Sequence, residues 1–288
     1  MTEENQQEIS VYDYVKSSDI LDMLSPLIDS GQYKLREIDG KLVPILTQIS
    51  RNNPWIHVKQ ATGLKCGLWH IITFNVVASK LPKGHQFVPR RCQNCWKVVV
   101  KPRTLQQLFS VLEMEKKLDR PSKCGIELRD TVPGLYGAYF YNTGIKAGLE
   151  CYDVVRNALL KNEILAPLVS EVDNNGRTTR IILKRACTEF EVLVGPSDKW
   201  EITEEQNYLE DLIEEYVVDN GVVPVQPEHV MYSIQRRWIE WAWKNGDPTY
   251  ALYTGGKPIS PAYVTYHQSE LLKETEKKAE TRSNKVKK

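Results

Sequence analysis

The sequence predicts a mixed α+β protein built around a four-stranded sheet. Short segments rich in β-branched and aromatic residues alternate with longer segments of helical apolar spacing between positions 97 and 187. Proline, glycine or asparagine lies at most of the junctions between these segments. A Cys-x-x-Cys motif, from Cys92 to Cys95, precedes the first of the strands and predicts a metal-binding knuckle at the entrance to the sheet.

Residues 1–53 are expected to form an N-terminal helix followed by a β-hairpin. Apolar residues recur at helical spacing over positions 11–29, where Pro26 interrupts them. Asp39-Gly40 then separates two alternating segments, and this dipeptide is a strong hairpin signal. Pro44 favours an edge position for the second strand, because proline cannot donate a ladder hydrogen bond.

Residues 54–200 are expected to hold the knuckle and the main sheet. The first strand is predicted at 97–101, and Thr104 can cap a helix that runs to about residue 118. The elements predicted after it are strands at 123–129 and 135–141, a helix at 144–160 and a strand at 180–187. The resulting order, βαββαβ, is that of a ferredoxin-like sheet.

Residues 201–268 are expected to be a C-terminal helical extension. Helices are predicted at 200–218 and 227–244, and Thr203 with Gln206 forms a capping-box pattern at the first of them. Residues 269–288 are rich in lysine and glutamate and are expected to form a disordered tail.

The composition is that of an ordinary globular protein. Hydrophobic residues make up 41% of the 288 residues and charged residues 26%. The net charge of +1 gives no overall attraction to nucleic acid or to anionic membranes, so any basic site must be local. No apolar segment reaches the roughly 18–20 residues that span a bilayer, and the polar N-terminus lacks signal-peptide features. We therefore expect a cytoplasmic protein without a membrane partner, whose cysteines are thiols or metal ligands.

Four cysteines are expected to bind one metal ion. Cys92 and Cys95 are the strongest signal, because two thiolates separated by two residues can bind the same tetrahedral ion. Neighbouring basic side chains would favour their thiolate form. Cys124, in a Lys-Cys-Gly context after a turn, is the expected third ligand, and Cys66, in the same context, is the expected fourth.

The cysteine pattern leaves alternatives open. His85 or Cys151 could replace Cys66 as the fourth ligand, and Cys187, in an apolar strand, is expected to lie in the core. Zinc is favoured because the ligands are scattered along the chain, whereas an iron–sulfur cluster, the alternative cofactor, is usually held by compact cysteine runs. Without a metal, the Cys-x-x-Cys cysteines would be small residues in a turn. Redox chemistry is disfavoured because the motif opens a strand rather than a helix.

Helices on one side of the predicted sheet would leave its other face free. Side chains alternate along a strand, and this alternation gathers basic and aromatic residues on the free face. Such a face suits stacked bases and phosphate contacts. The residues expected to bind nucleic acid there are Lys97, Lys101, Arg129, Tyr139, Tyr141 and Lys184.

The third strand resembles the aromatic strand of RNA-recognition motifs. Tyr136-Gly137 matches the Tyr-Gly step of that family, and Tyr141 matches its terminal aromatic residue. Leu135 and Ala138 depart from it, since the family has glycine and an aromatic residue at these positions. The resemblance implies RNA binding. If the aromatic residues of this strand instead pack inside the protein, a protein partner is the alternative.

The sequence therefore favours a non-enzymatic binding module that is stabilised by zinc and acts on protein or nucleic acid. It contains no His-Glu-x-x-His, P-loop or Gly-x-Ser-x-Gly motif. An enzyme stays open, because catalytic sites can be assembled from residues distant in sequence. In that alternative a metalloenzyme or cluster-containing enzyme has its site near Cys92 and Cys95, with one metal position open to substrate.

Overall fold

The computed structural model describes residues 33–38, 41–46, 53–59, 69–70, 73, 87–216, 226–257 and 259. The chain divides into two compact units, Met1–Tyr250 and Ala251–Lys288. The predicted N-terminal helix, Cys66, His85 and the predicted tail at 269–288 lie outside the described residues.

A β-hairpin near the N-terminus is confirmed. Strands β1 (Tyr33–Ile38) and β2 (Lys41–Leu46) pair antiparallel as a separate two-stranded sheet. Ile38 lies opposite Lys41, so the Asp39-Gly40 dipeptide joins the two strands at their closest ends.

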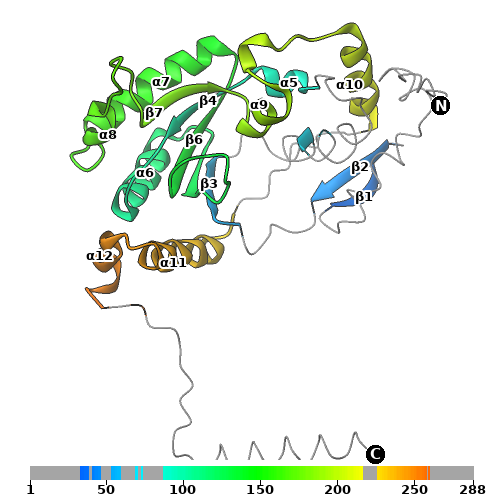
Figure 1. The fold of residues 1–288 in the computed structure, drawn as a ribbon. Coiled ribbons are helices and arrows are strands. Elements are labelled where there is room, and N and C mark those ends of the chain that lie inside the picture. Colours follow the sequence, from blue (N-terminus) through cyan, green and yellow to red (C-terminus); the bar gives the residue numbers. More distant parts are fainter. Residues whose placement is uncertain are drawn as a thin grey trace, which may run out of the picture. The chain divides into compact units, whose positions relative to one another are not determined.

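The main sheet has five antiparallel strands in the order β3-β5-β6-β4-β7 (Figure 1). Its strands are β3 (Trp55–Lys59), β4 (Cys95–Val100), β5 (Ser122–Ile126), β6 (Tyr136–Thr143) and β7 (Ile181–Arg185). The mixed helix-and-strand class is confirmed. The five-stranded order differs from the four-stranded ferredoxin-like sheet that the sequence predicts, because β3 adds an edge strand beside β5.

Helices connect the strands and follow the sheet in sequence. In the first unit they are α5 (Arg90–Gln93), α6 (Leu105–Leu118), α7 (Ile145–Leu160), α8 (Ala166–Ser170), α9 (Thr188–Val194), α10 (Glu204–Tyr216) and α11 (Glu228–Lys244), with 3₁₀ turns at Ser197–Lys199 and Pro248–Tyr250. The second unit begins with α12 (Ala251–Thr254). Within the described parts of the chain, none of the helices has the length and apolar character that a bilayer crossing requires.

One face of the sheet forms the hydrophobic core with α6, α7 and α11. Val98, Val100 and Phe140 point toward this face and are fully buried. The fully buried apolar residues of α6 are Leu105, Leu108, Val111 and Leu112. Trp238 of α11 belongs to the same core and donates its indole N–H to the Pro54 carbonyl oxygen at 2.7 Å. Helix α11 is therefore part of the core that covers the sheet.

Asp247 ties the segment after α11 to the sheet. Its Oδ2 accepts the backbone N–H of Leu105 at 2.6 Å and the hydroxyl of Tyr136 at 2.8 Å. Its Oδ1 accepts the backbone N–H and the hydroxyl of Thr249 at 3.0 and 2.7 Å. Leu105 begins α6, so the carboxylate also faces the positive end of that helix. Burial raises the pKa of Tyr136, and the neighbouring carboxylate raises it further.

Glu115 carries a carboxyl group into the core from α6. It is fully buried, and in the described part of the chain neither carboxyl oxygen has a hydrogen-bond partner of ordinary geometry. Its polar neighbour is the thiol of Cys124, which is also fully buried. Burial raises the pKa of Glu115 well above its ordinary value of 4.5. Burial therefore favours the protonated, neutral form of Glu115.

Replacing Asp247 with alanine is expected to lower the free energy of unfolding by about 2–4 kcal/mol, because the Tyr136 hydroxyl and the Leu105 N–H lose their acceptor inside the core. Urea unfolding measures the change. Asp153→Ala on the exposed side of α7 is the matched control, with an expected change within about 0.5 kcal/mol. A loss no larger than that of the control would contradict the role assigned to Asp247.

Replacing Glu115 with methionine is expected to raise the free energy of unfolding by about 1–3 kcal/mol at pH 8, since a poorly paired polar group leaves the core. The gain should shrink toward pH 4. The folded-state pKa is raised, so the wild-type protein loses stability as the pH rises above the ordinary carboxyl value. Urea unfolding at both pH values tests this, with the exposed Glu113→Met as control. An equal change at both pH values would show that Glu115 does not titrate as described.

Candidate functional site

The structure separates Cys124 from the Cys-x-x-Cys pair. Cys95 lies opposite Thr143 on β6, whereas Cys124 lies opposite Ala138, five positions away on the same strand. At about 3.3 Å per residue this separation is about 17 Å along the strand, far beyond the reach of one metal ion. The predicted third ligand is therefore wrong.

The Lys-Cys-Gly context of Cys124 has a different explanation. A Cβ atom at Gly125 would lie 2.3 Å from the Pro54 carbonyl oxygen, so glycine is needed where β3 approaches β5. The glycine thus reflects close packing of the edge strand rather than a metal-binding turn. No three His, Cys, Asp or Glu residues in the described ranges are grouped so that they could hold a metal ion.

The basic and aromatic residues predicted to bind nucleic acid share one face of the sheet, but that face is not free. Lys97 on β4 and Tyr139 on β6 are only 6% and 7% exposed. The Tyr139 hydroxyl donates to Glu127 at 2.7 Å. Lys184 on β7 forms an ion pair with Glu191 of α9. Lys101 and Tyr141 are half-buried on the same strands.

Arg129 is also held inside the protein. Its guanidinium donates to Glu127, to Glu189 at 2.8 Å and to the hydroxyl of Tyr139 at 2.8 Å. The hydrogen bond to Glu127 is the main reason that the pKa of Arg129 is raised, and Glu189 adds to it against the effect of burial. The expectation of an open binding face is therefore corrected for Arg129 as well as for Lys97 and Tyr139.

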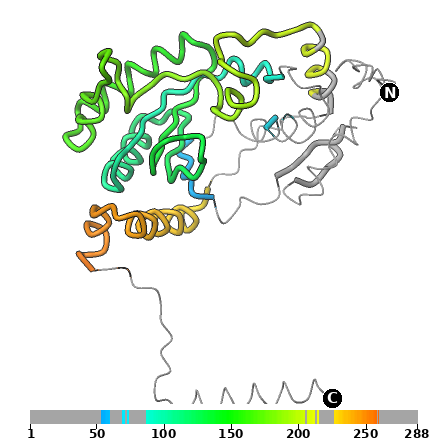
Figure 2. Tube along the Cα trace, in the orientation of Figure 1, coloured from blue at the N-terminus to red at the C-terminus, as the bar shows by residue number. Residues whose placement is uncertain are grey.

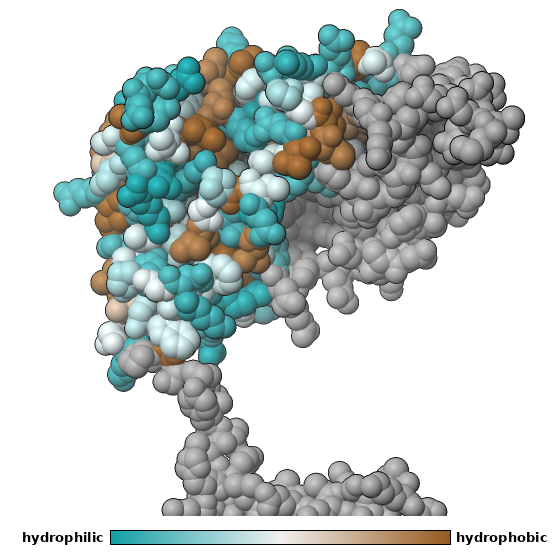
Figure 3. Space-filling view, in the orientation of Figure 1, coloured by the Kyte–Doolittle hydropathy of each residue, from teal (hydrophilic) through white to brown (hydrophobic). Residues whose placement is uncertain are grey.

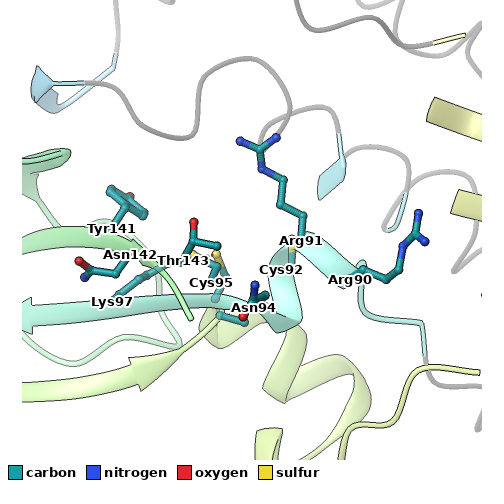
Figure 4. Close-up of a pocket in the computed structure, with 11 residues that line it drawn as sticks. Arg90, Arg91, Cys92, Asn94, Cys95, Lys97, Tyr141, Asn142 and Thr143 are labelled. Carbon is teal, nitrogen blue, oxygen red and sulfur yellow. Dashed lines mark hydrogen bonds between the residues drawn. The ribbon is translucent and has the colours of Figure 1, made fainter. Parts of the chain in front are cut away.

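A cavity of about 290 Å³ lies at the end of the sheet where β4 begins. It is formed by α5, by the ends of β4 and β6, and by the segment that follows β7. Figure 4 shows Cys95 and Thr143 beside one another, with Lys97 further along β4 and Arg91 extending from α5. The residues with reactive or basic side chains that line it are Arg90, Arg91, Cys92, Cys95, Lys97 and Cys187.

Cys187 faces this cavity because the chain bends at Ala186. Ala186 donates its N–H to the Cys95 carbonyl oxygen at 2.8 Å and so continues the pairing of β7 with β4. It then adopts a positive φ of 50°, a left-handed conformation that alanine rarely takes. The bend interrupts strand alternation and turns the Cys187 side chain toward Lys97. Cys187 therefore lies after β7 rather than within a strand as predicted, and it packs, partly buried, against the core cluster that contains Cys92 and Phe190.

Two basic side chains meet the Cys187 sulfur. The Lys97 Nζ lies 2.7 Å from Sγ, and the His70 Nε2 lies 3.3 Å from it. The His70 ring packs against Phe190 of α9, with ring centroids 5.0 Å apart. Figure 2 shows the chain at α5 and at α9 close together although they are far apart in the sequence, in agreement with the shared packing of Cys92 and Phe190.

These neighbours make Cys187 a thiolate at neutral pH. Burial alone would raise the pKa of its thiol, but the Lys97 ammonium and the His70 ring lower it to about 6. Lys184 adds a further positive charge nearby, and its own pKa is lowered by burial and by Lys97. Glu189 is close to His70 and binds Arg129, which lowers the pKa of its carboxyl against the effect of burial. By contrast, burial raises the pKa values of the Cys124 and Cys151 thiols.

The sequence offers one weak signal for this site. Cys187 immediately precedes a short acidic helix, α9, and cysteine at such a position is a known setting for a thiolate. The contacts of Cys187 with Lys97 and His70 join residues 90 and 117 positions apart, and neither follows from local spacing.

Comparison with known proteins adds no family assignment. The chain matches no protein-family model. Neither a curated protein nor a solved structure matches it. The function is therefore argued from the contacts described above.

Replacing Lys97 with methionine is expected to raise the pKa of the Cys187 thiol by about one to three pH units, because the closest positive charge is removed while the buried stem is kept. Thiolate absorbance in the ultraviolet, taken as the difference from Cys187→Ser, follows the titration. Lys101→Met, at the residue directly after β4, is the matched control and should leave the titration unchanged. An unchanged titration midpoint in Lys97→Met would contradict the ion pair between Lys97 and Cys187.

Proposed function

We propose that the protein is an enzyme that uses the Cys187 thiolate as a nucleophile toward a small electrophilic substrate. The observation that carries this proposal is the position of Cys187 Sγ, 2.7 Å from Lys97 Nζ and 3.3 Å from His70 Nε2. The thiolate is the reactive form of cysteine, and a neighbouring cation or imidazole is the usual means of stabilising it.

Each of the three side chains has a distinct role in this proposal. Cys187 attacks the substrate, and Lys97 keeps the sulfur ionised. His70 can accept or donate the proton that the reaction moves, since its ring nitrogen is within reach of the sulfur. The cavity of about 290 Å³ limits the substrate to a small molecule or to one side chain of a larger one.

We also propose that four strands of the sheet form a ferredoxin-like unit. Without β3, the order β5-β6-β4-β7 places β6 between β4 and β5, the two strands that α6 connects. This is the split βαβ arrangement. The unit supplies a rigid position for Lys97 on β4, a strand with neighbours on both sides, but a fold of this kind fixes no particular chemistry.

Labelling of the reduced protein with iodoacetamide at pH 7, followed by peptide mass mapping, tests the enzyme proposal. Cys187 is expected to react about fivefold faster than Cys95. The Lys97 and His70 contacts favour the reactive thiolate form of Cys187, and this gain outweighs the lower intrinsic nucleophilicity that accompanies a low pKa. Cys124 and Cys151 should stay unlabelled because they are buried. His70→Gln should slow the labelling of Cys187 without changing that of Cys95.

Elemental analysis of the same sample separates this proposal from the zinc-stabilised module. One equivalent of zinc that is lost in Cys187→Ser would show that the sulfur is a metal ligand, and the nucleophile proposal would fall. Slow labelling of Cys187 in metal-free protein would also contradict it.

A further inference from the structure

Cys95 is a second thiol that lines the same cavity as Cys187. Cys95 and Lys97 are alternate residues of β4 and therefore project from the same face of the sheet. Lys97 meets the Cys187 sulfur on that face, and Cys95 lines the same cavity at the end of the strand (Figure 4). The two cysteines thus line one cavity from β4 and from the segment that follows β7.

The backbone pairing is compatible with a disulfide between the two cysteines. The Ala186 N–H is bonded to the Cys95 carbonyl oxygen, so Cys187 directly follows the residue paired with Cys95. Paired strands lie about 4.8 Å apart, and disulfides join Cα atoms that are roughly 4.4–6.8 Å apart. The bend at Ala186 turns the Cys187 side chain to the face that carries Cys95.

We propose that the electrophile is a hydroperoxide, which the protein reduces while Cys187 and Cys95 are oxidised to a disulfide. This inference rests on the proposed function, because it requires Cys187 as the nucleophile. A reactive thiolate that is solvent-accessible and stands next to a second thiol is the arrangement from which sulfenic acid condenses to a disulfide. The second thiol is the feature that selects a peroxide over an acyl or alkyl substrate.

The reaction balances in two steps. The Cys187 thiolate attacks one oxygen of the peroxide, the S–O bond forms, the O–O bond breaks, and the leaving alkoxide takes a proton from Lys97 or His70 to become an alcohol. The Cys95 thiol gives its proton to the same base and attacks the Cys187 sulfur. The S–S bond forms, the S–O bond breaks, and the leaving hydroxide takes that proton back from the base to become water. Two thiols lose two electrons and the peroxide gains them. A dithiol reductant restores both thiols.

Cys95 is better placed for the second step than Cys92. Cys92 is buried on α5 in a cluster with Val88, Phe190 and Trp200, against which Cys187 also packs. Cys95 is half-buried at the cavity wall and begins the strand that carries Lys97. Cys92 is therefore the alternative thiol that the experiment must distinguish.

The test treats reduced full-length protein with one equivalent of hydrogen peroxide, counts the remaining thiols and maps the peptides. The free thiols are expected to fall from six to four, with a Cys95–Cys187 crosslink that dithiothreitol reverses. Cys92→Ser should form the same crosslink. Cys95→Ser should stop at a Cys187 sulfenic acid that dimedone traps. Peroxide consumption should be about tenfold slower in Lys97→Met, because its thiolate fraction is smaller.

The outcomes separate this inference from the proposed function. If iodoacetamide labels Cys187 rapidly but peroxide leaves all six thiols intact, the inference is wrong and the nucleophile stands. A crosslink that joins Cys92 to either other cysteine would also overturn it. If neither reagent reacts with Cys187, both proposals fail.

Discussion

The candidate site depends on one buried lysine, Lys97, which lies on the second strand from one edge of the sheet. Lys97 is 6% exposed, and an ammonium removed from water is costly unless an anion or strong acceptor meets it. The sulfur of Cys187 meets it at 2.7 Å. The two side chains depend on each other, since the lysine keeps its charge beside the thiolate and the thiolate keeps its charge beside the lysine.

The other charges on this face of the sheet are paired in the same way. Lys184 binds Glu191, and Arg129 binds Glu127 and Glu189. Each of these carboxylates binds a basic side chain of the same face. The ion pairs of this face are therefore internal to the protein and partly buried. On the side shown in Figure 3, hydrophilic and hydrophobic side chains are interspersed in small groups over the described part of the chain. The ion pairs around Lys97 therefore form a local charged cluster that the net charge of the chain does not indicate.

The order of the elements could be predicted from the sequence because each carries a local signal. Thr104 caps α6 by accepting the Gln107 N–H at 3.2 Å, as its hydroxyl predicts, and the hairpin follows from Asp39-Gly40. A strand near Trp55 could be suspected from the sequence, but its pairing with β5 as a fifth strand could not be predicted, because that pairing depends on the close approach of Pro54 to Gly125. The candidate site depends on the left-handed backbone conformation of Ala186 and on contacts between residues far apart in the sequence. Its residues therefore show no spacing pattern from which the site could be predicted. The same limit explains why Cys124 was misplaced as a metal ligand.

The central claim is that Cys187 is a thiolate at neutral pH, and the pH dependence of its alkylation tests this most directly. The rate at Cys187, followed by mass spectrometry of the labelled peptide between pH 4 and 10, is expected to reach half its maximum near pH 6. The rise should be absent from Cys187→Ser and displaced upward in Lys97→Met. A midpoint near 9, the value of an ordinary thiol, would contradict the ion pair and the function proposed from it.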